Sequence, residues 1–413
     1  MAKICLSPEE VALLQKNVSN VSKFEFDYFH STRIDLMLFA NIKKYGIDVS
    51  DNPLWQEVIY KVHRKHIVLP EVERAQEFIE NNHLPIYSIK GAQSNRLYSE
   101  GEGIRVHKDY DYIALSSESA FQLASFLFSK GFVIASGVFS IKKVVINGNI
   151  RFSGHFHLRK VLHNQFEVVI DINYPGFPLG RIDLYNPLLK GNCLSDEEQF
   201  MITLCHAFKH RDVPMKDLND LYLMMQKREL DYEYILQRIQ LYGLEFYASM
   251  LFGFIFDHYD FDETTVAMIT RRLRIDKEIY RSFPHWPFDP GEELKVKQRD
   301  LDKRSKEKID YMRIYLSPLI VYKENSPIYE SALHDLGDAG YTVDCLGEYV
   351  WEATRDNIGF ILTSMGIFID TYADVVSVGR EKIKCYLREL LSILGVKTFY
   401  DVMVDLHPLT KWF

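Results

Sequence analysis

The sequence predicts an α+β protein in which a mixed sheet with flanking helices lies between two mostly helical regions. Residues 1–82 show helical periodicity and form an N-terminal helical region, whereas residues 83–190 carry the short apolar and alternating runs of strands. Residues 191–281 return to helical patterns as a second helical domain. A Pro/Gly-rich break at 283–291 then separates a mostly helical C-terminal region, 292–413.

The composition of the 413-residue chain is that of a soluble protein. A net charge of −8 argues against a general nucleic-acid binder, which usually carries a basic excess. Five cysteines without a C-x-x-C pair suit free thiols in a reducing compartment. The longest nearly apolar run, Ile358–Ile369, is far shorter than the roughly 20 residues that span a bilayer. With no signal-peptide pattern at Met1, we expect a cytoplasmic protein without membrane contact.

Helices are predicted throughout the N-terminal region. The first begins at Pro8 with Ser7 as its cap, because Ser followed by Pro and Glu is a typical helix start. Further helices are predicted near 21–45, over 53–66 and over 70–81. We find no catalytic pattern here and expect an arm that packs on the core or on a partner.

The core begins with a buried strand at Pro85–Ile89, a turn at Lys90-Gly91 and a short helix over 92–98. The next strand carries Asp109 and Asp111, which alternation places on one face. Two neighbouring carboxylates are costly to keep ionised unless a cation lies between them. Because Mg²⁺ prefers oxygen ligands, the pair indicates a magnesium site.

A helix over 117–129 and several strands complete the predicted core. The Asn147-Gly148 dipeptide predicts a hairpin between 142–146 and 150–152, and 155–158 extends the same sheet. In the last strand, 165–174, Asp171 shares a face with Glu167, Val169 and Asn173, whereas Val168, Ile170 and Ile172 share the other. A capping box at Ser195 then opens a helix to about His210, and further helices follow to about Arg281.

Lys90-Gly91, Arg105 and Asp109-x-Asp111 resemble the signature of the DNA polymerase β-type nucleotidyltransferase superfamily. Within it, the pattern is most similar to a bacterial family of uncharacterised nucleotidyltransferases. The resemblance continues through Asp171 and His206 and covers about residues 75–230. It implies a polymerase β-like arrangement for the core at 83–190.

The resemblance also implies an activity and its cofactor. An enzyme of this type moves NMP from an NTP such as ATP to an acceptor by a two-metal mechanism with pyrophosphate release. Asp109, Asp111 and Asp171 would be the catalytic residues and would hold Mg²⁺ or Mn²⁺. The nucleotide-binding residues would be Lys90, Gly91, Ser94 and Arg105, although Ala92 stands where the commoner motif has a second Gly or Ser.

The acceptor and the base of the NTP cannot be derived from these residues. A small-molecule or peptide acceptor, as for a biosynthetic tailoring enzyme, is favoured by analogy. The alternatives are modification of a protein or of a tRNA end, and a degenerate module that binds nucleotide without catalysis. The acidic net charge disfavours tRNA, and the presence of all three carboxylates disfavours the degenerate module. The oligomeric state stays open.

Several histidines allow a metal interpretation. His155 and His157 share a strand face, but no third ligand has zinc-like spacing. His206 and His210 share a helix face, which would also permit metal binding. We predict structural or substrate-contact roles for them. Asp220 matches a family position and is expected to accept hydrogen bonds within the helix bundle, and Asn173 stands where the family usually has His.

Overall fold

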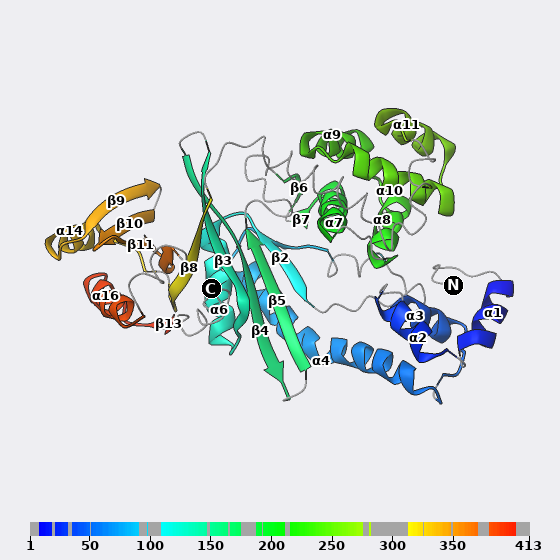
Figure 1. Cartoon of the computed structure of the whole chain (residues 1–413), viewed down its shortest axis with the longest axis horizontal. Coiled ribbons are helices and arrows are strands. Elements are labelled where there is room, and N and C mark those ends of the chain that lie inside the picture. Colours follow the sequence, from blue (N-terminus) through cyan, green and yellow to red (C-terminus); the bar gives the residue numbers. More distant parts are fainter. Residues whose placement is uncertain are drawn as a thin grey trace. The chain divides into compact units, whose positions relative to one another are not determined.

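In the computed structural model the chain forms two compact units, and each unit is assembled from three separate stretches of sequence (Figure 1). The helical unit comprises 1–67, 88–108 and 186–308, and the sheet unit comprises 68–87, 109–185 and 309–413. Within these units the structure describes residues 8–18, 21–31, 35–49, 51–90, 97, 109–146, 149–163, 166–174, 187–191, 193–210, 215–275, 281, 313–324, 326–347, 350–370 and 380–401. The four domain ranges expected from the sequence stay a prediction.

The N-terminal helices of the helical unit pack around one tryptophan. Trp55 is completely buried, meets Phe26 edge to face at 5.5 Å and stacks with Phe39 at 6.2 Å. Its indole N–H donates to the carbonyl of Val18 over 3.3 Å, which satisfies its one polar group. The helices around it are α1 (Pro8–Val18), α2 (Lys23–Ser31), α3 (Asp35–Lys44) and the first part of α4 (Pro53–Asn81).

Helix α4 differs from the sequence prediction. Two helices were expected, over 53–66 and 70–81, whereas α4 is continuous from Pro53 to Asn81 with Pro70 inside it. A proline removes one backbone donor and usually kinks or ends a helix. Here the buried Val68, Val72 and Ala75 flank Pro70, so packing outweighs the lost hydrogen bond.

The remainder of the helical unit is a bundle that follows a short strand pair. Ser195 caps the first helix of the bundle, since its hydroxyl accepts from the N–H of Glu198 over 3.2 Å, as the sequence predicted. The elements are β6 (Leu189–Lys190), β7 (Cys193–Leu194), α7 (Asp196–His210), α8 (Met215–Lys227), α9 (Tyr232–Tyr242), α10 (Glu245–His258) and α11 (Glu263–Leu273).

The sheet unit is built on one mixed sheet with the strand order β1-β2-β5-β4-β3-β8-β12-β11-β10-β9, and β13 pairs with β8 beside this path. The β2 and β5 strands are parallel, and the β3–β4 and β4–β5 pairs are antiparallel. The first five strands are β1 (Ile86–Ser88), β2 (Tyr110–Ala114), β3 (Val133–Ile146), β4 (Asn149–Leu162) and β5 (Phe166–Tyr174). The mixed α/β class is therefore confirmed.

Helix α6 (Ser117–Ser129) covers one face of this sheet. Ser116 caps it by accepting from the N–H of Ser119, and its bounds are those predicted from the sequence. Phe121 of α6 packs on Phe156 of β4 and on Phe368 farther along the sheet, with ring centroids 5.1 and 5.0 Å away. The opposite face of β4 and β5 is thereby left to the polar side chains.

The prediction of a mostly helical region over 292–413 is wrong for its described residues. Six strands and two helices lie there, and β8 pairs with β3, so this region extends the sheet that began near residue 86. The elements are β8 (Arg313–Tyr322), α14 (Glu330–Asp338), β9 (Thr342–Gly347), β10 (Val350–Arg355), β11 (Ile358–Thr363), β12 (Gly366–Asp370), α16 (Arg380–Ile393) and β13 (Phe399–Asp401).

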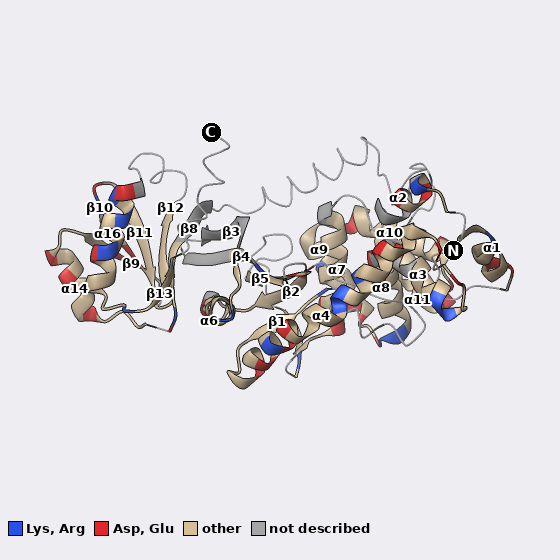
Figure 2. Ribbon diagram, turned by 90° about the horizontal axis from the view of Figure 1, so that it is seen from below, with Lys and Arg blue, Asp and Glu red and all other residues tan. Residues whose placement is uncertain are grey.

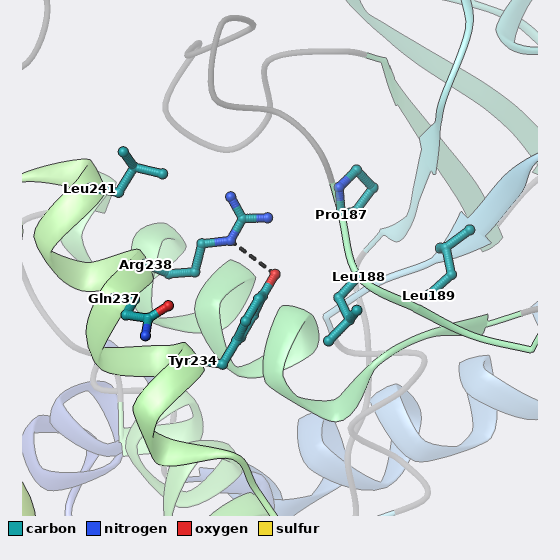
Figure 3. Close-up of a pocket in the computed structure, with 7 residues that line it drawn as sticks. All are labelled: Pro187, Leu188, Leu189, Tyr234, Gln237, Arg238 and Leu241. Carbon is teal, nitrogen blue, oxygen red and sulfur yellow. Dashed lines mark hydrogen bonds between the residues drawn. The ribbon is translucent and has the colours of Figure 1, made fainter.

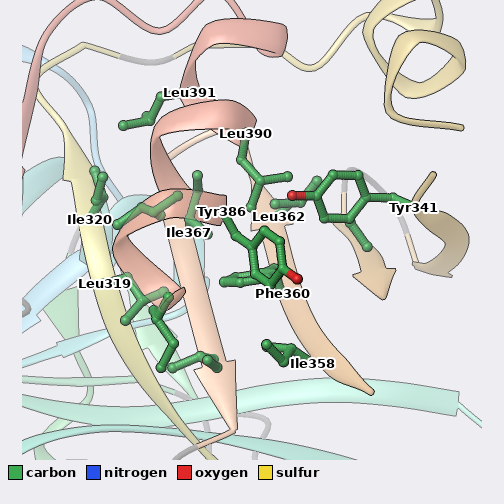
Figure 4. Packing of buried hydrophobic residues seen from close by; sticks show 14 of the residues in the cluster. Leu319, Ile320, Tyr341, Ile358, Phe360, Leu362, Ile367, Tyr386, Leu390 and Leu391 are labelled. Atoms are coloured by element: carbon green, nitrogen blue, oxygen red, sulfur yellow. The ribbon is translucent and has the colours of Figure 1, made fainter. Parts of the chain in front are cut away.

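Helix α16 lies on this part of the sheet and closes a large apolar cluster (Figure 4). Tyr386 and Leu390 of α16 point onto Phe360 and Leu362 of β11, and β8 and β12 supply the neighbouring aliphatic side chains. Removing apolar surface from water stabilises a fold by about 25 cal/mol per Å². Burial of this cluster therefore stabilises the region.

A tight backbone contact inside this sheet gives a first prediction. A Cβ atom added to Gly366 would lie 2.4 Å from the carbonyl oxygen of Ile320, and backbone cannot rotate away as a side chain can. We expect Gly366→Ala to lower the free energy of unfolding by about 1–3 kcal/mol, measured by urea denaturation.

Gly359 on β11 provides the matched control. A Cβ there would lie 3.0 Å from Oε1 of Glu352, the far end of a flexible side chain. Gly359→Ala should therefore cost much less than Gly366→Ala. Equal losses in the two variants would contradict the contact assigned to Gly366.

The charged surface is mixed in sign, in keeping with the modest net charge. Figure 2 shows Lys and Arg interspersed with Asp and Glu along α4 and α16. Among the described residues, no helix is both long and apolar enough to cross a membrane.

Candidate functional site

Two carboxylates lie side by side on neighbouring strands near the β1 end of the sheet. Asp111 of β2 and Asp171 of β5 are direct partners in the parallel register, so their side chains leave the same face of neighbouring strands. Both residues are buried. The Val168, Ile170 and Ile172 side chains of β5 point to the other face and are fully buried, which is the alternation that the sequence predicted.

Asp109 and Asn173 flank this pair. Asp109 directly precedes β2 and is half-buried, and alternation along the chain places it on the face of Asp111. Asn173, two residues after Asp171, donates from Nδ2 to the carbonyl of Tyr112 over 3.3 Å. This bond joins β5 to β2 next to the two carboxylates and gives Asn173 a structural role.

Two histidines of β4 reach Asp171 from its other side. His157 is the register partner of Asp171, and its Nδ1 lies 2.6 Å from Oδ1 of the carboxylate. His155, two residues earlier on the same face, has its Nε2 3.4 Å from Oδ2. Oδ1 is buried, and among the described residues no group donates a well-directed hydrogen bond to it. The close contact of His157 with Oδ1 therefore becomes an ion pair when the imidazole is protonated, although its hydrogen-bond geometry is poor.

These contacts shift the pKa values of both partners. Burial raises the pKa of Asp171, but the polar contacts and charges of His155 and His157 outweigh it and leave that pKa well below its usual value. The contact with Asp171 raises the pKa of His157 against the effect of burial, and the charge of Asp109 adds to the rise. Asp171 is therefore ionised at neutral pH, as a metal ligand must be.

The structure gathers only part of the predicted donor set. Within the described ranges, a single group of His, Cys, Asp or Glu side chains has three donor atoms within 4.8 Å of one another, and it consists of His155, His157 and Asp171. Asp109 and Asp111 share the face but lie outside this group. The donor chemistry of the three aspartates fits Mg²⁺ or Mn²⁺, because all are carboxylates and two of them are adjacent and buried.

Of the predicted nucleotide-binding residues, one is described. Lys90 follows β1 and adopts a left-handed conformation with φ of 51°, which suits a sharp turn after the strand. Gly91, Ser94 and Arg105 lie outside the described residues. Their predicted roles stay predictions.

The other predicted polar residues lie in the helix bundle. Nδ1 of His206 is 3.6 Å from Oδ2 of Asp217, and Asp217 and Asp220 are buried on α8. His206 belongs to no group of three metal donors in the described part of the chain, and the side chain of His210 lies outside it. A packing role for His206 agrees with this placement.

The bundle also carries an open pocket of about 670 Å³ (Figure 3). Pro187, Leu188 and Leu189 form one wall, and α9 forms the other with Tyr234 and Arg238 among its lining residues. Nε of Arg238 donates to the Tyr234 hydroxyl over 2.9 Å. Nη2 of Arg238 pairs with the buried Glu198 at 2.9 Å, so an acidic residue beside the pocket balances its charge.

A comparison with known protein families found a match to this chain. A family model described as uncharacterised nucleotidyltransferase matches residues 26–255, which is more than half of the chain and wider than the 75–230 inferred from motifs. The match includes the carboxylates, both histidines of β4 and the helix bundle as far as α10. No curated protein matches the chain.

Proposed function

We propose that this chain, which belongs to the family of uncharacterised nucleotidyltransferases, transfers NMP from an NTP to a small-molecule or peptide acceptor. In this reaction an acceptor oxygen bonds to the α-phosphorus, the bond from the α-phosphorus to the oxygen that bridges to the β-phosphate breaks, and pyrophosphate leaves. A hydroxyl acceptor releases its proton to water. The observation that carries the proposal is the register of Asp111 with Asp171. It places two buried carboxylates side by side inside the residues that the family model matches. Two ionised carboxylates repel each other at this distance, and only a cation or a cationic side chain nearby offsets the repulsion.

Asp109, Asp111 and Asp171 would hold the divalent ions, Mg²⁺ or Mn²⁺. When bound, such ions supply positive charge to the triphosphate and to the attacking oxygen. The lowered pKa of Asp171 suits it to holding an ion better than to accepting a proton from the acceptor. Asn173, which is bonded to the β2 backbone, would keep the two acidic strands in register.

Lys90, Gly91, Ser94 and Arg105 would bind the triphosphate. A glycine lets backbone approach a phosphate closely, and the N–H groups at the start of a helix attract anions. Lys and Arg would add charge, with Arg able to bind two phosphate oxygens at once. The left-handed turn at Lys90 supports a sharp change of direction after β1, as this role requires.

Calorimetry with each of the four NTPs, in the presence and absence of Mg²⁺ or Mn²⁺, tests the proposal. We expect triphosphate binding only with a divalent ion, together with slow formation of NMP and pyrophosphate when water is the acceptor. Mass spectrometry of reactions with cell extract would then identify the acceptor. Binding of NTP without a metal, and without pyrophosphate, would instead favour a non-catalytic nucleotide-binding module.

A further inference from the structure

Three side chains on the polar face of the sheet bring their donor atoms together as a metal site does. His155, His157 and Asp171 each offer one ligand atom, and these atoms all lie within 4.8 Å of one another. We propose that they bind a divalent first-row transition ion that accepts imidazole ligands, such as Zn²⁺, Fe²⁺ or Co²⁺. The two imidazoles set this site apart from the all-carboxylate set of the proposed reaction.

Strand pairing, not loop conformation, positions the three ligands. Asp171 and His157 face each other across the antiparallel β4–β5 pair, and His155 is the next residue of β4 on that face. The imidazole rings are 6.3 Å apart at an interplanar angle of 84°, so they do not stack on each other. Sites held by strands keep their geometry better than sites on loops, because the ladder fixes the backbone.

The site is open to solvent on one side only. The side chain of Asp171 is 9% exposed, whereas those of His155 and His157 are 34% and 27% exposed. An ion can therefore reach the histidines from solvent and bind the buried carboxylate next to them. Three protein ligands also leave coordination positions for water or a substrate oxygen, as catalytic metal sites do.

The donor chemistry selects the class of ion. Imidazole nitrogen suits Zn²⁺, Fe²⁺ and Ni²⁺, whereas Mg²⁺ and Mn²⁺ prefer oxygen ligands and Mg²⁺ keeps its waters. Metal–ligand bonds of about 2.0–2.2 Å place neighbouring donor atoms roughly 3 Å apart. The His157 contact of 2.6 Å and the His155 contact of 3.4 Å bracket that spacing, so small side-chain rotations suffice.

This inference deepens the proposed function by naming a second kind of ion at the Asp171 side of the site, but metal binding can be measured without nucleotide. The full chain is freed of metal with a chelator and titrated with Co²⁺, whose visible absorption reports binding to imidazole. We expect one Co²⁺ per chain. The His155→Ala/His157→Ala variant should lose affinity by at least about tenfold, since even outer-shell partners of a metal contribute that much.

Two controls make the titration decisive. Glu167→Gln removes a carboxylate that lies on the Asp171 face of β5, is 41% exposed and belongs to neither proposed metal set, and it should retain Co²⁺ binding. His334→Ala removes a histidine that faces Asp338 at 3.8 Å on the exposed surface of α14, and it should also bind as the original chain does. His155→Ala alone, at the most exposed of the three ligands, serves if the double variant fails to fold.

The contrary outcomes are equally clear. No Co²⁺ absorption in the original chain, equal affinity in the histidine variants, or loss of binding in Glu167→Gln would each overturn the assignment. Because the readout is metal occupancy, failure here leaves NTP binding untouched. Conversely, Co²⁺ binding at the histidines in a chain that binds no NTP would count against the proposed function alone.

Discussion

Asp111→Asn should lower the rate of NMP and pyrophosphate formation by about a thousandfold, which corresponds to roughly 4 kcal/mol of lost transition-state stabilisation. The amide keeps the size of the side chain but loses the negative charge next to Asp171. Because Asp111 and Asp171 are buried register partners, no neighbouring solvent can substitute for that charge. Pyrophosphate release at saturating NTP and Mg²⁺ measures the effect, and calorimetry should show weaker metal-dependent NTP binding.

Asp338→Asn is the matched control for this substitution. Asp338 ends α14 in the same compact unit, with a side chain that is 78% exposed. It should leave both turnover and the melting temperature unchanged. A turnover in Asp111→Asn close to that of the original chain would remove Asp111 from the catalytic set, whatever the fold of the family.

Much of the structure around Asp111 and Asp171 was predictable, because the local sequence patterns and the tertiary packing agree there. Val168, Ile170 and Ile172 lie fully buried on one face of β5, whereas the other face carries Asp171 and Asn173 beside the apolar Val169, as the sequence pattern predicts. Ser116 and Ser195 begin their helices as short polar caps do. The pairing of Asp111 with Asp171 needed more, since parallel register depends on a crossover that no local pattern encodes.

The C-terminal strands were missed for a different reason. Residues 358–369 form a nearly continuous apolar run, which periodicity cannot distinguish from a buried helix. The run is in fact β11 and β12 joined by a turn, in which the Thr363 hydroxyl accepts from the N–H of Gly366 over 3.1 Å. Helix α16 covers one face of these strands, and Phe121 of α6 packs on Phe368 of the other face. Because both faces are buried, their alternation is lost from the sequence.

The grouping of His155 and His157 with Asp171 was also missed, although a signal existed. Strands β4 and β5 are joined by a short connection, and Leu162 pairs with Phe166 at its base. Counting outward from such a turn pairs His157 with Asp171 and His155 with Asn173. Searching for zinc-like spacing along one strand alone hides ligands that a neighbouring strand supplies.

Glu198→Ala should destabilise the helical unit by about 3–5 kcal/mol, because it removes a buried carboxylate that pairs with Arg238, whose side chain is only 12% exposed. Oε1 of Glu198 accepts from Arg238 at 2.9 Å, from the N–H of Leu188 at 3.2 Å and from the Tyr234 hydroxyl, so three donors lose their acceptor at once. Urea denaturation followed by circular dichroism measures the loss.

Glu233→Ala is the matched control, since Glu233 lies on α9 and pairs with an arginine of α11, but both side chains are about half exposed. Its loss should stay below about 1 kcal/mol, as exposed ion pairs contribute little. If the two variants lost equal stability, the Glu198–Arg238 pair would be a surface contact in solution and not the buried link between α7 and α9 that the structure contains.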